Sequence, residues 1–278
     1  MILEIPDLKI RNPYLALGIE DAIAEYSGAH YQSLGITGFL RVWSNSKTIV
    51  LGRTCNAESN ISANFLKDFQ PSMDPRIWRN RPMIARRISG GGTVVHGPGN
   101  INYSFFLPIE KFQELYPVRH SYEVFLGMVM RSLESQGIET EMKGMSDIVV
   151  DAKGSPKKIS GNAQFRKYGM IVHHGTLLIQ KDIISLITRF LNHPPVEPDY
   201  RQKRIHDDFL VNLPESFDLS GFYNSLLSQL KGYVNAESML CPTVILHDII
   251  NRGKQKAKQL YANSEWILNG HYSLIGAK

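Results

Sequence analysis

The stretch RRISGGGTVVHGPGNINYSFF occupies residues 86–106 and carries the densest chemical signal in the chain. Across residues 83–108 short apolar runs alternate with glycine, which predicts strand, glycine loop, strand, turn and strand. Three consecutive glycines allow positive φ and a close approach to a ligand, and successive N–H groups can form a concave anion site. Arg86 and Arg87 would add fixed positive charge. A glycine-rich hairpin with surface arginines fits GGG alone equally well.

This loop matches neither of the two commonest nucleotide-binding patterns, because it lacks both GxxxxGK[ST] and G-x-G-x-x-G. Around it, strand patterns cluster in the middle of the chain and helical patterns flank them. That order predicts an α+β fold with a mixed, mostly antiparallel β-sheet flanked by helices, not a doubly wound parallel sheet. We expect helices at 14–34, 119–136 (ended by Gly137), 182–191, 219–231 and 247–262, a β-hairpin of 39–43 with 48–52, strands throughout 138–180, a tight turn at DAKGSP (151–156), and irregular connections at 71–82 and 194–214.

A second signal is KKISGNAQ at residues 157–164. A lysine close to a glycine in a strand can point at a ligand that the backbone approaches closely. Its ammonium can pair with a carboxylate and then with the phosphate of an acyl-adenylate. The alternative is a pair of solvated lysines beside a turn.

The third signal is HHGTLL at residues 173–178. Neighbouring strand residues face opposite sides, so His173 and His174 cannot easily bind one metal ion together. The chain has nine histidines but no HExxH or comparable spacing. A hydrogen-bonding role in a pocket, or a purely structural role, is therefore favoured over a metal site.

In this order, the motifs resemble the lipoate–protein ligase branch of the biotin/lipoate ligase family. That family has an arginine pair before GGG, a V-x-H segment, and then G-N with an aromatic-rich strand. It continues with a short acidic motif, matched by Ser146-Asp147-Ile148, then K-I-S-G and HHGTLL. A C-terminal element with E-W is matched by QLYANSEW at 259–266, followed by Gly270. The resemblance spans roughly residues 14–270 and implies a class II biotin/lipoate ligase-like catalytic domain.

The resemblance implies a two-step reaction. Lipoic acid, the substrate, attacks the α-phosphate of ATP to form an acyl-adenylate, and a lysine of a carrier protein then displaces AMP. Lys158 would contact the acyl-adenylate, and Asp147 would lie near the nucleotide and its Mg²⁺. The acceptors would be lipoyl carrier domains of 2-oxoacid dehydrogenase complexes or the glycine cleavage H protein. The other residues expected to bind substrate or adenylate are Arg86 or Arg87, Gly90, Gly91, Gly92, His96, Asn100, Ser160, Gly161, His174 and Gly175.

One departure bears on the reaction. Ligases commonly have H-D-x-G-N after the glycine loop, whereas this chain has HGPGN at 96–100, a string reminiscent of octanoyltransferases, which use a cysteine thioester. The only two cysteines, Cys55 and Cys241, lie outside the core motifs, which favours the ATP route. Cysteine-dependent octanoyl or lipoyl transfer and a non-catalytic acyl-binding role remain alternatives. A biotin ligase is disfavoured because no G-R-G-R-x-G segment occurs.

Length predicts a lipoate ligase-like catalytic domain at 1–245 and a C-terminal helical extension at 246–278, without a full accessory domain. The catalytic domain would then either act alone or need a separate accessory subunit for adenylation. Arginines of the 71–82 insertion either meet an acidic carrier or lie in a solvated loop.

The overall composition argues against several functional classes of protein. Apolar residues make up 43% of the 278 residues and charged residues 21%, and no stretch approaches the roughly 18 apolar residues of a membrane span. We expect no membrane partner. The net charge of +5 is modest and spread along the chain, so we expect no nucleic acid. Two cysteines and no signal peptide favour a reducing cytoplasm.

Overall fold

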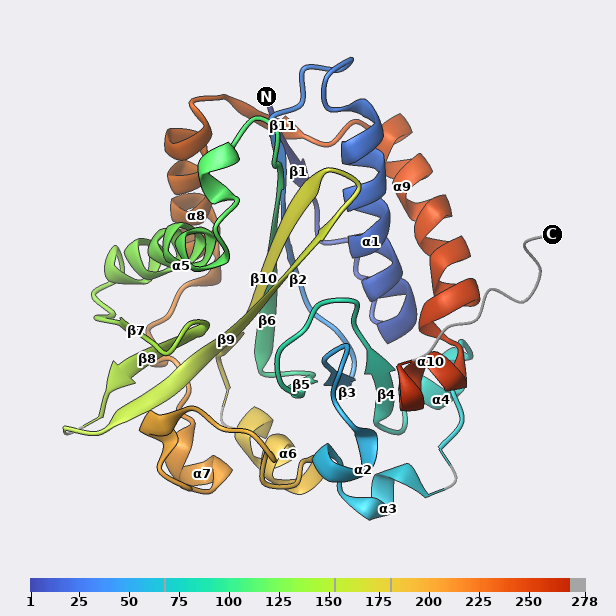
Figure 1. The fold of residues 1–278 in the computed structure, drawn as a ribbon, viewed down its shortest axis with the longest axis vertical. Helices are drawn as coiled ribbons and strands as arrows, with labels where there is room; N and C mark the ends of the chain where they lie inside the picture. Colours follow the sequence, from blue (N-terminus) through green and yellow to red (C-terminus); the bar gives the residue numbers. More distant parts are fainter. Residues whose placement is uncertain (68, 153, 181, 271–278) are drawn as a thin grey trace.

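A computed structural model describes residues 1–67, 69–152, 154–180 and 182–270 of the chain. Two helices, α5 (Val118–Glu134) and α8 (Leu219–Val234), cover one face of a large sheet, and α1 (Pro13–His30) and α9 (Thr243–Lys256) lie over the other face (Figure 1). The predicted α+β class is therefore confirmed. Within these residues, no helix has the length and apolar character needed to cross a membrane.

The large sheet has the strand order β11-β1-β2-β6-β10-β9-β8-β7. Pairs from β2 to β7 are antiparallel, and β1 lies parallel to both β2 and β11. The sheet is therefore mixed and mostly antiparallel, as predicted. The strands are β1 Ile2–Ile5, β2 Gly38–Trp43, β6 Asn100–Pro108, β7 Glu141–Lys143, β8 Asp147–Asp151, β9 Pro156–Lys167, β10 Met170–Leu178 and β11 Ser238–Leu240.

A second, three-stranded sheet has the order β4-β3-β5, with β3 (Thr48–Leu51) parallel to β4 (Met83–Arg86) and antiparallel to β5 (Val94–His96). The predicted hairpin of 39–43 with 48–52 is therefore wrong, because β2 pairs with β1 and β6 in the large sheet. Both strands are buried, and each finds its partners far away in sequence. The connection between them carries the chain from one sheet to the other.

The predicted series of three strands over 83–108 is confirmed as β4, β5 and β6, although β6 belongs to the large sheet. The insertion at 71–82 is not wholly irregular, since Asp74 caps one helical turn, α4 (Pro75–Trp78). The predicted turn at DAKGSP joins β8 to β9, with Lys153 outside the described residues. The remaining short elements are α2 Ala57–Asn60, α3 Ala63–Leu66, η1 Gln113–Leu115, α6 Asp182–Phe190, η2 Asp199–Arg201, α7 His206–Phe209, the π-helical turn η3 Ala257–Tyr261 and α10 Ser264–Asn269.

Helix α1 begins where Asn12 accepts a hydrogen bond from the Leu15 N–H at 2.9 Å and Pro13 occupies the first turn. It packs closely on α9, because a Cβ on Gly18 would lie only 2.5 Å from the Gly253 carbonyl oxygen.

The predicted boundary at 245/246 falls inside α9, and residues 271–278 of the predicted extension lie outside the described part of the chain. The division into two units stays a prediction.

The α1–α9 contact gives a stability prediction. We expect Gly18→Ala to lower the free energy of unfolding by about 1–3 kcal/mol, because the added methyl group overlaps the backbone of α9. Gly232→Ala, in α8, is the matched control. No heavy atom would lie within 4 Å of its Cβ, so it should gain about 0.5–1 kcal/mol. Urea denaturation measures both, and equal changes would contradict this account of the contact.

Candidate active site

The floor of the candidate site is one row of residues across five strands. The register pairs Asp147 with Gly161, Gly161 with Thr176, Thr176 with Asn102, and Asn102 with Trp43. Cross-strand partners share a face of a sheet, and this row faces α1 and the small sheet. A cavity of about 290 Å³ lies between this row and the small sheet. Its floor runs from a carboxylate at β8 to an indole ring at β2.

Lys158 reaches this face because of an irregularity in β9. The pairing with β8 shifts between Ile148 and Val149, so that Ile159 is an extra residue in β9. Regular alternation would turn Lys158 away from the face that Gly161 occupies, and the bulge re-aims it. A Cβ on Gly161 would lie 3.0 Å from Lys158 Nζ, so the glycine leaves room for the lysine to lie across the strand.

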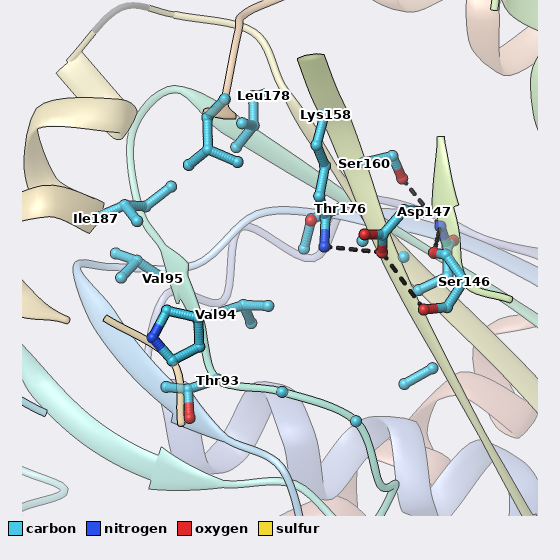
Figure 2. Close-up of a pocket in the computed structure, with 18 of the residues that line it drawn as sticks. Thr93, Val94, Val95, Ser146, Asp147, Lys158, Ser160, Thr176, Leu178 and Ile187 are labelled. Atoms are coloured by element: carbon cyan, nitrogen blue, oxygen red, sulfur yellow. Dashed lines mark hydrogen bonds and ion pairs between the residues drawn. The ribbon is translucent and has the colours of Figure 1, made fainter. Parts of the chain in front are cut away.

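The ammonium of Lys158 contacts Asp147 at the charged end of the row. Lys158 Nζ lies 2.8 Å from Asp147 Oδ1, and the Tyr200 hydroxyl donates to Asp147 Oδ2 at 2.7 Å. Figure 2 shows Lys158 pointing toward Asp147, with Ser146 and Ser160 beside the pair. Across the cavity it shows Thr93, Val94, Val95 and Ile187. Charged and apolar walls therefore meet within one cavity.

The glycine loop is held by Arg87. The guanidinium Nη2 donates to the carbonyls of Gly90 and Gly92, each at 2.7 Å, and Nε donates to Ser89 Oγ at 2.8 Å. Gly91 between them has φ +81°, which favours glycine. In the described part of the chain, the N–H groups of residues 90–92 have no acceptor. Three successive free donors beside a buried arginine form a site suited to an anion.

Arg86 does not line the cavity, contrary to one of the two expectations for the arginine pair. It is 1% exposed, and its guanidinium donates only to backbone carbonyls. Nε bonds to Trp266 and Ile267, and Nη2 to Leu268, each at 2.9 Å. In return, Trp266 Nε1 donates to the Arg86 carbonyl at 3.0 Å. Arg86 thus joins the end of α10 to β4, the strand before the glycine loop. The same hydrogen bonds hold the E-W element, which lies in α10, against β4.

A buried chain of polar groups connects the loop to α1. Ser89 Oγ lies 2.7 Å from His174 Nε2, and His174 Nδ1 lies 2.9 Å from Glu20 Oε2. Ser104 donates to Glu20 Oε1 at 2.6 Å. Burial by itself would raise the pKa of Glu20, but His174, the Ser104 hydroxyl and Arg41 outweigh it and lower this pKa to about 2. Glu20 is therefore an ionised carboxylate beneath the cavity.

His173, Ser160 and Gly175 belong mainly to the opposite face of the sheet. His173 stacks on Phe125 of α5 with ring centroids 4.8 Å apart. Ser160 lies 3.1 Å from the Tyr103 hydroxyl. Any side chain on Gly175 would collide with Tyr103 and Asn162. The two adjacent histidines thus face opposite sides, as predicted.

The side chains around Asp147 offer few ligands for a magnesium ion. Among the residues that the structure describes, no three His, Cys, Asp or Glu side chains lie close enough to hold a metal. Asp147 offers one carboxylate at the charged end, already in contact with Lys158 and Tyr200. Mg²⁺ is commonly held by one or two carboxylates together with phosphates and water. The site fits such an ion only where nucleotide phosphates supply most of the ligands.

Most of the expected site residues meet at this cavity. Arg86, Gly90 and Asn100 are outside its lining, and Asn100 instead bonds to Gly97 and Asn102. Sequence reasoning missed Glu20, Asn102 and Tyr200. Of these, Glu20 could have been recognised as a charge inside an apolar helical pattern. The expected residues in the lining are Arg87, Gly91, Gly92, His96, Asp147, Lys158, Ser160, Gly161, His174 and Gly175.

The depressed pKa of Glu20 predicts a pH-dependent contribution to stability. A carboxylate whose folded pKa lies below its unfolded value stabilises the fold above the unfolded pKa of about 4.5, and loses this effect as pH falls toward 2. We expect Glu20→Gln to cost roughly 3 kcal/mol near neutral pH, and progressively less between about pH 4.5 and pH 2.

Urea denaturation over that pH range measures this difference. Glu25→Gln on the same helix is the control, because Glu25 is partly exposed and pairs with Lys256 at 3.2 Å. It should change stability by less than about 1 kcal/mol. A pH-independent cost for Glu20→Gln would contradict the ionised, hydrogen-bonded state.

Comparison with known proteins agrees with this architecture. The lipoate-protein ligase LplJ of Bacillus subtilis is 30% identical over 187 residues, which are 67% of this chain and 49% of that protein. Lipoate-protein ligase A of Bdellovibrio bacteriovorus is 31% identical over 175 residues, 63% of this chain and 44% of that protein. The chain thus spans about half the length of the curated relatives it matches.

Two solved structures share the fold. A bi-partite lipoate protein ligase of Thermoplasma acidophilum has a TM-score of 0.71 at 18% identity, covering 99% of this chain and 98% of that one. A lipoate-protein ligase A bound with ATP has a TM-score of 0.66 at 20% identity, covering 98% and 100%. The family model for the lipoyl protein ligase A/B catalytic domain matches residues 12–230. The chain therefore belongs to the lipoyl protein ligase A/B catalytic domain family.

Proposed function

We propose that this chain is a lipoate–protein ligase, which activates lipoate (or octanoate) with ATP and transfers the acyl group to a lysine of a lipoyl carrier domain. The observation that carries the proposal is the position of Lys158. Its ammonium lies over Gly161, which stands in the floor between the charged end at Asp147 and the apolar end at Trp43. An acyl carboxylate bound there would have its tail on the apolar side and its reacting carbon beside the cation.

The residues would act by positioning and electrostatics. In the first step the acid's carboxylate attacks the α-phosphorus and pyrophosphate leaves. In the second, a carrier amine attacks the acyl carbon and AMP leaves. Lys158 would bind the carboxylate and then an oxygen of the adenylate, and the free N–H groups of residues 90–92 would hold phosphate oxygens. Arg87, fixed by Ser89, would keep that loop in place.

Asp147 would help to hold a magnesium ion bound with the nucleotide, and such an ion would supply positive charge to the phosphates. Asp147 would also orient Lys158 before substrate enters, since Lys158 Nζ and Asp147 Oδ1 lie 2.8 Å apart. The structural relative named as a bi-partite ligase with its E2 lipoyl domain supports a lipoyl domain as acceptor. Its description as bi-partite supports a second component for this chain too, and we propose that such a component would take part in adenylation.

The first test is intact-mass analysis of a lipoyl carrier domain incubated with the protein, lipoate, ATP and Mg²⁺, and in parallel with presynthesised lipoyl-adenylate. We expect a lipoyl mass gain at least with the adenylate, and Lys158→Ala should slow it by about 100-fold or more, because the cation beside the acyl-adenylate is lost. Lys157→Ala is the matched control, since Lys157 is the neighbouring lysine of β9 and does not line the cavity. No gain in either reaction, or equal rates in the two variants, would sink the proposal.

The cysteine-thioester alternative makes a different prediction. Neither thiol lines the cavity: Cys55 Sγ contacts the Gly91 carbonyl at 3.3 Å, and Cys241 is buried beside β11, where burial raises its thiol pKa to about 11. We expect the Cys55→Ser/Cys241→Ser double variant to retain carrier modification within about twofold, since no covalent intermediate forms on sulfur. Loss of activity in a variant that still melts cooperatively would favour acyl transfer.

A further inference from the structure

His173, the first histidine of HHGTLL, lies apart from the proposed reaction. It is a fully buried residue of β10, on the face of the large sheet opposite the cavity, and it does not line that cavity. Its ring stacks on Phe125 with centroids 4.8 Å apart and meets Tyr122 edge-on at 5.4 Å. Such surroundings suit an apolar ring, so the two nitrogens of His173 call for an explanation.

Both ring nitrogens of His173 contact side chains of the neighbouring strand β9. Nδ1 lies 3.0 Å from Gln164 Nε2, and Nε2 lies 3.2 Å from Asn162 Oδ1. At one end, Gln164 Oε1 lies 2.9 Å from the hydroxyl of Ser121 in α5. At the other end, Asn162 Nδ2 lies 2.9 Å from the carbonyl oxygen of Ser146. These five residues form a line of polar contacts from α5 to the residue before β8.

The Ser146 carbonyl sets the direction of the hydrogen bonds in this line. A carbonyl oxygen can only accept, so the NH₂ group of Asn162 must face it, and Asn162 Oδ1 is then an acceptor. His173 must therefore carry its proton on Nε2. Burial lowers the pKa of His173 well below its usual range, so the ring is neutral and Nδ1 accepts. Gln164 donates to Nδ1 and in turn accepts from the Ser121 hydroxyl.

The line ends on the peptide unit from which Asp147 begins. The Ser146 carbonyl and the Asp147 N–H belong to one planar group, so holding the oxygen also holds the backbone at Asp147. Asn162 contacts that oxygen twice, through its side chain and through its own N–H, each at 2.9 Å. Figure 2 shows Ser146 beside Asp147, whose carboxylate contacts Lys158. A histidine on one face of the sheet is thus connected to the charged end of the cavity on the other.

We propose that His173 is a positioning residue for the reaction, which acts through Asn162 and the Ser146 carbonyl to hold Asp147 against Lys158. The inference rests on the proposed function and adds to it a residue that touches no ligand. Asp147 orients the lysine, and His173 orients the peptide that carries Asp147.

Loss of the His173 N–H has a defined consequence. It removes one of two donors to Asn162 Oδ1, the other being the Tyr103 hydroxyl. The amide then holds the Ser146 carbonyl less firmly, and the carboxylate beyond it is less well placed to orient the lysine. Misplacing a group at a reaction centre by about 1 Å can cost roughly 100-fold in rate. Because one donor remains, we expect a loss nearer to tenfold.

The test compares two amides at position 173, with presynthesised lipoyl-adenylate and a lipoyl carrier domain as substrates. In His173→Gln the amide nitrogen can take the place of Nε2 and donate to Asn162. In His173→Asn the shorter side chain reaches only the place of Nδ1, so it keeps the contact with Gln164 and loses the one with Asn162. Each variant loses one buried hydrogen bond, so urea denaturation should find both destabilised alike. We expect His173→Gln to stay within about threefold of the wild-type rate and His173→Asn to be about tenfold slower.

A double-mutant cycle asks whether His173 acts through Asp147. Asp147→Asn should itself slow the transfer by about tenfold or more, since Lys158 loses its anionic partner. If the two residues act as a unit, the double variant His173→Asn/Asp147→Asn is no slower than Asp147→Asn, because the second change removes nothing further. A merely structural effect of His173 would multiply with that of Asp147 instead. Ser132→Ala is the control: its buried hydroxyl, also in α5, donates to the Met128 carbonyl, and its loss should leave the rate unchanged.

The outcomes separate this inference from the proposed function. Equal rates for the two amide variants, a wild-type rate in Asp147→Asn, or multiplied effects in the double variant would each overturn the inference alone. Absence of transfer by the wild type contradicts the proposed function, and the inference falls with it. If His173→Asn does not fold, His173→Phe takes its place in the cycle, because it keeps the ring stacked on Phe125 and loses both hydrogen bonds.

Discussion

The structure of the site depends on one buried chain of hydrogen bonds that joins two sheets. Arg87, after β4 of the small sheet, holds the glycine loop and contacts Ser89. Ser89 contacts His174 of the large sheet, and His174 contacts Glu20 of α1. These hydrogen bonds hold the glycine loop at a fixed distance from the row of residues that forms the cavity floor. The cavity therefore lies between the two sheets. Arg87, Ser89 and Glu20 are buried and the His174 side chain is 12% exposed, so removing one member would leave the others unpaired in a region of low polarity.

The cavity has a polarity gradient that follows from strand register. Asp147, Gly161, Thr176, Asn102 and Trp43 lie in one row because each strand pairs in register with the next. A charged group at β8 and an aromatic ring at β2 are therefore separated by a fixed number of strand spacings. A ligand with a charged head and an apolar tail can lie along this row in one direction only, since the reverse would bury its head against Trp43.

Glycines serve the site in three physically different ways. Gly91 takes a positive φ that forms the loop, Gly161 leaves space for Lys158 on the cavity face, and Gly175 leaves space for Tyr103 and Asn162 on the other face. Sequence reasoning predicted the first use from GGG. It placed Gly161 and Gly175 in the site but not their separate roles, because the face that a glycine serves depends on neighbours from other strands.

The sequence by itself determined the α+β class, the long helices, most strands of the large sheet and the motifs that meet at the cavity, because periodicity and glycine content are local properties. Tertiary structure decided which strands pair, and it separated β2 from β3 where a hairpin was expected. It also decided that Arg86 serves the end of α10 while Arg87 serves the loop. Adjacent strand residues face opposite sides, and only the packing of distant segments decides which side becomes the cavity. The bulge that turns Lys158 toward Asp147 is likewise a property of the paired strands, which is why no local pattern in KKISG predicts it.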